Sequence, residues 1–63
     1  NESAARLRDA VARLSATQRE VFTLRVVEGL SYKEIAIVAD TTEGAARVHY
    51  HNAMRSVRTY LDV

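Results

Sequence analysis

Apolar residues recur at three- and four-residue steps along the whole of this 63-residue chain. Such spacing is typical of amphipathic helices, and the alternation with a period of two that marks a half-buried strand is absent. Proline is absent and only two glycines occur, so little interrupts the helical pattern. The sequence therefore predicts an all-α domain.

Two short motifs divide this pattern into helices. Ser15-x-x-Gln18 and Ser31-x-x-Glu34 have the form of a capping box. In this motif the serine hydroxyl accepts a bond from the backbone N–H three residues on, and the side chain there accepts one from the serine N–H. Gly29 stands where a helix commonly ends in a left-handed residue. We therefore expect helices to begin at both serines.

Four helices are expected, over about residues 3–13, 15–28, 31–39 and from residue 42 through 61. Asp40 tolerates a left-handed turn better than most non-glycine residues. Thr42 suits the N-cap of the last helix. The core residues expected from the first two helices are Leu7, Ala10, Val11, Leu14, Val21, Phe22 and Leu24, with Val27 as a further candidate.

The last helix separates into two faces at 100° per residue. The apolar face carries Ala46, Tyr50, Ala53, Val57 and Leu61. The other face carries Gly44, Arg47, Val48, His51, Asn52, Arg55 and Arg58, and residues 46–61 include no acid. A short helix, a tight turn and a longer helix form a helix-turn-helix, whose second helix enters the DNA major groove. Tyr50 is expected to pack in the core and not to stack on bases.

Size and composition argue against several other classes. A domain this small has no room for a deep substrate cleft. Ser15 and Ser31 are explained as caps, and no carboxylate pair or glycine-rich phosphate loop is present, so we do not expect an enzyme. Cysteine is absent, which excludes disulfides and thiolate metal sites. His49 and His51 would point about 200° apart on a helix and cannot share an ion.

No metal, cofactor, small-molecule substrate or membrane partner is therefore predicted, and no segment is long and apolar enough to span a bilayer.

The net charge of +1 is weak for a nucleic-acid-binding protein taken as a whole. The chain begins at Asn1 and not at methionine, which favours a single domain, residues 1–63, within a longer protein.

From Leu14 onward the chain resembles region 4 of the bacterial sigma-70 factors, most closely the extracytoplasmic-function (ECF) class. The resemblance rests on three stretches: Leu14-Ser15-Ala16-Thr17-Gln18-Arg19-Glu20-Val21-Phe22, Glu28-Gly29-Leu30-Ser31-Tyr32-Lys33-Glu34-Ile35-Ala36 and Glu43-Gly44-Ala45-Ala46-Arg47. The second and third stretches correspond to the helix-turn-helix described above.

Two alternatives remain open at this point. Residues 47–55 also resemble the output domain of LuxR/NarL-type regulators. Those regulators usually have one residue fewer between the equivalents of Leu14 and Gly29, and their last helix breaks where residues 58–61 continue it. The other alternative is a protein-interaction module without DNA binding, with Val26 or Val27, Val48 and Tyr60 as apolar anchors.

The sigma resemblance implies recognition of the promoter −35 element, while the rest of the factor binds the RNA polymerase core. It also implies a cytoplasmic protein under the control of an anti-sigma protein that covers the DNA-reading face. Arg47 matches the basic residue usual early in the recognition helix and would contact a base or a phosphate. Lys33, Arg55 and also Arg58 would lie against phosphates.

Several residues depart from the family pattern. Val48 and Asn52 stand where serine and arginine are common, and they suit a thymine methyl group and an adenine edge. Asp40 replaces a usual turn glycine. Arg19 and Arg25 are equally compatible with solvated surface charges and with contacts to DNA or polymerase. The expected DNA-binding residues are Lys33, Thr42, Gly44, Arg47, Val48, His51, Asn52 and Arg55.

Overall fold

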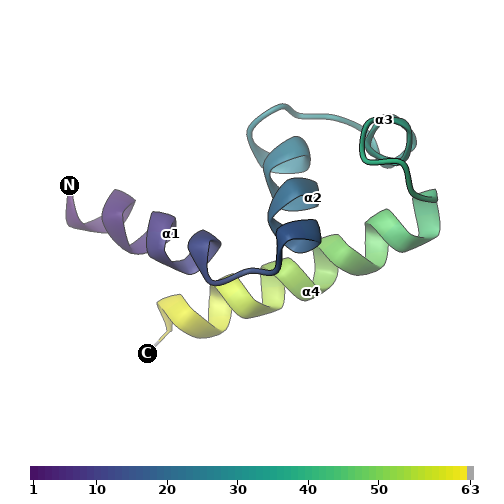
Figure 1. The fold of residues 1–63 in the computed structure, drawn as a ribbon. Coiled ribbons are helices and arrows are strands. Elements are labelled where there is room, and N and C mark those ends of the chain that lie inside the picture. The colour runs from purple at the N-terminus through teal and green to yellow at the C-terminus, as the bar shows by residue number, and fades with distance from the viewer. Residues whose placement is uncertain (63) are drawn as a thin grey trace.

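A computed structural model describes residues 1–62 of the chain (Figure 1). Within that range it contains four helices and no strand. They are α1 (Glu2–Ala12), α2 (Ala16–Val26), α3 (Tyr32–Val38) and α4 (Glu43–Leu61). Each expected helix is present with its ends within two residues of the expected ones, which confirms the all-α class and the helix-turn-helix formed by α3 and α4.

The other three helices all pack against α4, the longest helix (Figure 1). A helix of this length spans about 28 Å, close to the 34 Å longest extent of the chain. α1 and α2 diverge from each other above α4, and α3 lies beside the first turns of α4. The predicted apolar face of α4 is confirmed, because Ala46, Ala53 and Val57 are buried and Tyr50 and Leu61 are half-buried.

Two clusters of buried side chains hold this arrangement together. The first joins α1, α2 and α4 and consists of Ala10, Leu14, Phe22, Ala53 and Val57. The second joins α2, α3 and α4 and consists of Val21, Ile35 and Ala46. Tyr50 packs against both clusters, and its ring stacks on Phe22 with a centroid distance of 6.4 Å. The prediction that Tyr50 packs in the core is therefore confirmed.

Two residues expected in the core are exposed instead. Leu7 is 43% exposed and Val27 is 72% exposed. Val27 is the C-cap of α2, beyond the last regular turn. Leu7 lies on the predicted stripe of α1, but no neighbouring helix covers that part of the stripe. Periodicity identified the face of the helix correctly, whereas the burial of that face depends on how far α1 and α2 diverge.

The capping boxes differ from each other. At Ser31 both bonds form: the Glu34 N–H donates to Ser31 Oγ over 3.1 Å, and the Ser31 N–H donates to Glu34 Oε1 over 2.9 Å. At Ser15 the Gln18 N–H donates to the serine hydroxyl over 3.2 Å, but within residues 1–62 the Gln18 side chain makes no return bond. The box predicted at Ser31 is confirmed, and the one at Ser15 is reduced to a simple N-cap.

The capping box makes the stability of the chain depend on pH. Hydrogen bonds from the Ser31 backbone and then its side chain hold the pKa of Glu34 below its usual value. A lowered pKa stabilises the folded state at neutral pH, and this contribution is lost as the pH falls through the folded-state pKa. We expect the stability difference between wild type and Glu34→Gln, measured by urea unfolding, to shrink between about pH 7 and pH 3. A difference that stays constant over that range would contradict the assignment.

Left-handed residues form the turns on both sides of α3. The φ angle is 70° at Gly29 and 53° at Asp40. After α3 the Thr41 N–H donates to the Ala36 carbonyl over 2.9 Å, and the Asp40 N–H donates to the Ile37 carbonyl over 3.4 Å. This is a Schellman helix end with aspartate in the place that glycine usually takes. The predicted left-handed turn at Asp40 is confirmed.

Replacing Asp40 with glycine is expected to raise the free energy of unfolding by about 0.5–1 kcal/mol. The substitution removes a Cβ that is unfavourable at this φ and a carboxylate at the negative end of α3. The larger backbone entropy of glycine in the unfolded chain offsets part of the gain. Asp40→Asn removes only the charge and should gain less. Urea unfolding of the three proteins tests this order, and a Gly variant no more stable than wild type would refute it.

Arg19 and Arg25 are structural residues in this fold. The Arg19 guanidinium donates to the carbonyls of Val11 (3.4 Å), Ala12 (3.1 Å) and Leu14 (2.9 Å). These acceptors lie at the end of α1, which has no basic residue in its own last turn. Arg25 donates to the Leu30 carbonyl over 2.9 Å, in the loop before α3. Neither arginine is a plain solvated charge, because each is bound to the backbone of another segment.

Candidate nucleic-acid interface

The side of α4 turned away from the other helices is a continuous exposed surface. We call it the recognition strip, and it consists of Gly44, Arg47, Val48, His51, Asn52, Arg55 and Arg58, all of them exposed. Every residue predicted for this face therefore reaches solvent. The strip contains three arginines, and Glu43 is the only acid of α4, at its first position. A helix face of this composition carries the positive charge that a DNA backbone attracts.

Local structure fixes where the strip begins. Thr42 is the N-cap of α4, and its hydroxyl accepts a bond from the Ala45 N–H over 3.0 Å. Gly44 lies in the first turn of α4, and a Cβ added there would meet nothing within 4 Å. Packing inside the chain therefore does not require glycine at this position. An external surface can approach the backbone closely here, as glycine permits.

Arg47 is the only residue of the recognition strip whose guanidinium lies over an aromatic ring in the part of the chain that the structure describes. It lies 4.8 Å from the centre of the Tyr32 ring. The Arg25 guanidinium lies 4.5 Å from the centre of the same ring. The edge of Tyr32 in turn meets the Tyr50 ring, with a centroid distance of 6.1 Å and an interplanar angle of 67°. Sequence spacing did not indicate this cluster, because its arginines and tyrosine come from three different helices.

The remaining predicted residues are also accessible. Lys33 is exposed on α3, next to Tyr32. Within residues 1–62, neither Lys33 nor any arginine of the recognition strip forms an ion pair with a carboxylate. His51 is exposed while His49 is half-buried, as expected for two residues on different sides of one helix. No group of three His, Cys, Asp or Glu residues in this range could hold a metal ion.

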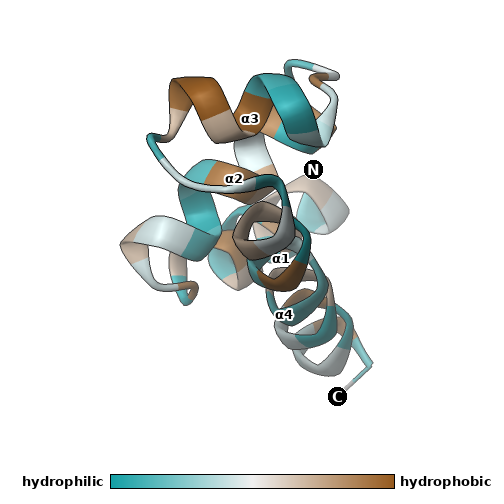
Figure 2. Ribbon diagram, turned by 90° about the vertical axis from the view of Figure 1, so that its right-hand side faces the viewer, coloured by the Kyte–Doolittle hydropathy of each residue, from teal (hydrophilic) through white to brown (hydrophobic). Residues whose placement is uncertain are grey.

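Apolar side chains are also exposed around α3. Ile37 is 75% exposed and Val38 is 57% exposed, and Figure 2 shows strongly hydrophobic turns in this helix. Val48, on the recognition strip, is 57% exposed. The Val48 side chain is therefore accessible from outside the chain. Among the described residues no helix is long and apolar enough to cross a membrane.

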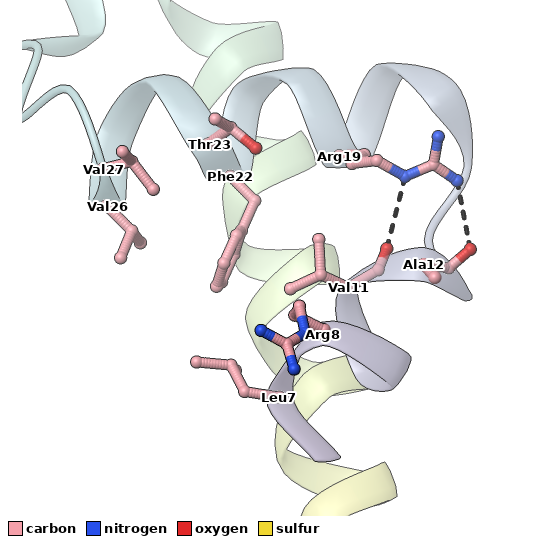
Figure 3. Close-up of a pocket in the computed structure, with 9 residues that line it drawn as sticks. All are labelled: Leu7, Arg8, Val11, Ala12, Arg19, Phe22, Thr23, Val26 and Val27. Carbon is pink, nitrogen blue, oxygen red and sulfur yellow. Dashed lines mark hydrogen bonds between the residues drawn. The ribbon is translucent and has the colours of Figure 1, made fainter. Parts of the chain in front are cut away.

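A second surface lies between α1 and α2 (Figure 3). It is an open, mainly apolar groove of about 640 Å³, in which Leu7 and Val11 of α1 face Phe22 and Val26 of α2, with Val27 at its edge. The divergence of the two helices creates it, and this accounts for the exposure of Leu7 and Val27. No residue of α4 lines the groove, so it does not overlap the recognition strip.

Comparison with known proteins identifies the family. The family model described as sigma-70, region 4 matches residues 4–57, which run from the first turn of α1 to the last turn of α4. The chain belongs to the sigma-70 region 4 family. This confirms the resemblance found in the sequence and decides against the LuxR/NarL alternative. The continuation of α4 to Leu61, where those regulators typically break, agrees with that decision.

Two groups of curated relatives illustrate the match. The ECF RNA polymerase sigma factor SigD of Mycobacterium tuberculosis is 40% identical over 57 residues, which cover 90% of this chain and 27% of the relative. The ECF RNA polymerase sigma factor BldN of Streptomyces coelicolor is 42% identical over 59 residues, 94% of this chain and 22% of the relative. The chain thus spans about a quarter of the length of these relatives. No solved structure matches it.

Proposed function

We propose that the chain recognises the promoter −35 element as region 4 of an ECF-type sigma factor, with α4 in the major groove. The observation that carries this proposal is the exposed recognition strip, which has three arginines, none of them paired with a carboxylate within residues 1–62. The relatives are sigma factors of this class by name. The proposed role is binding and not catalysis, with no metal or cofactor.

Within this proposal the recognition strip, together with Lys33 of α3 and the N-cap Thr42, makes two kinds of contact with DNA. Val48, His51 and Asn52 are suited to base edges, since asparagine can pair with adenine and valine can contact a thymine methyl group. Lys33, Arg55 and Arg58 are suited to phosphates, which position the protein without reading sequence. Thr42 and Gly44 lie at the start of α4, where the absence of a Cβ at residue 44 lets a DNA strand approach the backbone.

The proposal also needs a protein surface, because a sigma factor binds the RNA polymerase core and DNA at the same time. We assign the polymerase contact to the groove between α1 and α2, because it is apolar and does not overlap the recognition strip. Val27→Glu should then weaken binding to the polymerase core while leaving DNA affinity unchanged.

An anti-sigma protein that covers the recognition strip would act by competing with DNA. Both partners imply a cytoplasmic location.

The central proposal can be tested by letting the chain select its preferred duplexes from a randomised DNA library. We expect enrichment of a short motif and binding that weakens as salt is raised. Asn52→Ala should cost about 1–3 kcal/mol and relax the preference at the base that it contacts. If the chain bound no duplex, or bound DNA with an affinity independent of salt, the protein-interaction module would be favoured over the promoter-binding role.

A further inference from the structure

We propose that Arg19 is a positioning residue that keeps the groove between α1 and α2 open. Its guanidinium ties the end of α1 to the start of α2, and without this tie α1 would swing toward α2 and close the groove. The inference rests on the proposed function only where it concerns RNA polymerase, because that function assigns the groove to the polymerase core. The opening of the groove can be measured without any partner.

The tie lies at the vertex where α1 and α2 meet (Figure 3). Arg19 belongs to the first turn of α2. Its Nε donates to the Val11 carbonyl over 3.4 Å, and its Nη2 donates to the carbonyls of Ala12 (3.1 Å) and Leu14 (2.9 Å). Carbonyl groups in the last turn of a helix lack partners within that helix, and the helix dipole favours a cation beside them. One side chain of α2 therefore completes the end of α1.

The rest of α1 is anchored to α4 and not to α2. Within α1 only Ala10 is buried, in the cluster that includes Ala53 and Val57 of α4. Near the other end of α1, the Arg6 guanidinium donates to the Leu61 carbonyl over 3.0 Å. Away from the vertex α1 and α2 diverge (Figure 1). A contact at the vertex of two diverging helices sets the angle between them, and Arg19 supplies that contact.

The side chains on the two walls of the groove favour its closure. Leu7 and Val11 of α1 face Phe22 and Val26 of α2. Contact between the walls would remove apolar surface from water, which is favourable. Rotation of α1 toward α2 would in turn move its last carbonyls away from the donors of Arg19, which a planar guanidinium holds in a fixed fork. The three hydrogen bonds therefore oppose closure.

The distance between the open ends of α1 and α2 tests the proposal in the 63-residue chain. Because the chain has no cysteine, spin labels can be attached only at Ala4→Cys and Glu28→Cys. Both positions are exposed and lie outside the lining of the groove. Double electron–electron resonance should give one narrow distance distribution when Arg19 is present. Arg19→Lys keeps the charge but lacks the planar fork, so it should broaden the distribution and shift it to shorter distances, and Arg19→Gln should shift it further.

A second arginine of the same groove provides the matched control. Arg8 lines the groove from α1, and within residues 1–62 no hydrogen bond joins it to α2. Arg8→Lys therefore removes a guanidinium and keeps the charge without releasing the tie, and it should leave the distances at their wild-type values. Thermal unfolding of each labelled variant separates a released α1 from a lost fold. If Arg19→Gln unfolds, Arg19→Lys still provides the test.

Binding to the RNA polymerase core connects the tie to the proposed function. If the groove of Arg19→Lys is open about one tenth of the time, its apparent affinity for the core falls about tenfold. DNA affinity should stay at the wild-type value, because no residue of α4 lines the groove. A general loss of structure would instead weaken both kinds of binding.

The outcomes distinguish this proposal from the proposed function. Distances that stay unchanged or become longer in both Arg19 variants would refute the positioning role, whatever their affinity for polymerase. Shorter distances with unchanged affinity for the core would support the positioning role and overturn the assignment of the groove to polymerase. Shorter distances with weaker core binding and unchanged DNA binding would support both.

Discussion

Ile35→Ala is expected to cost about 2–4 kcal/mol of stability. Ile35 is fully buried and is the largest fully buried side chain together with Val21. It fills the cluster that joins α3 to α2 and α4. A domain of this size has a total stability of only about 3–9 kcal/mol. The variant should therefore lose a large share of its stability, which urea unfolding followed by circular dichroism would show as a lower midpoint.

A neighbouring isoleucine makes the control nearly ideal. Ile37 is on the same helix, two residues away, and is 75% exposed. Ile37→Ala removes the same atoms and should change the free energy of unfolding by less than about 0.5 kcal/mol. If the two variants lost equal stability, the burial of Ile35 and the position of α3 would both be wrong. DNA binding should weaken with Ile35→Ala, because α3 supports the first turns of α4.

Local chemistry made much of the fold predictable. Ser31 and Thr42 as helix starts, and Gly29 and Asp40 as left-handed turns, depend on residues within one turn of one another. The two faces of α4 follow from period alone, and the long stretch from Ala46 to Leu61 leaves no ambiguity in that period. The residues that a helix-turn-helix would present to DNA could therefore be named from the sequence, and each of them is exposed in the structure.

Contacts between helices were not predictable in the same way. Arg19 was open to several roles because the carbonyls that it binds belong to the end of another helix. Val27 looked apolar enough for the core, but its burial depends on a neighbour that α1 does not supply. The Arg25–Tyr32–Arg47 cluster needs three helices to be placed first. The residues themselves do not indicate which DNA element is proposed as the target. That part of the proposal comes only from the resemblance to sigma factors.

Lys33→Gln combined with Arg55→Gln should produce the largest loss of DNA binding that leaves the fold intact. Both side chains are exposed and unpaired within residues 1–62, so their removal should change stability little. If each neutralises one phosphate, the salt slope falls by about 1.8 and affinity at 0.1 M falls roughly 60-fold. The loss should be the same for every duplex, because phosphate contacts carry no sequence information. Fluorescence anisotropy over a salt series measures both quantities.

The double variant lowers the net charge from +1 to −1, so a control must remove the same charge elsewhere. Arg8→Gln with Arg13→Gln does so, since Arg8 lines the groove between α1 and α2 and Arg13 stacks on Tyr60. If DNA affinity followed only net charge, the two double variants would lose it equally. If the recognition strip and α3 hold the phosphates, the control keeps the wild-type slope. Because the chain carries so little net charge, the position of its cations, and not their number, must then account for DNA binding.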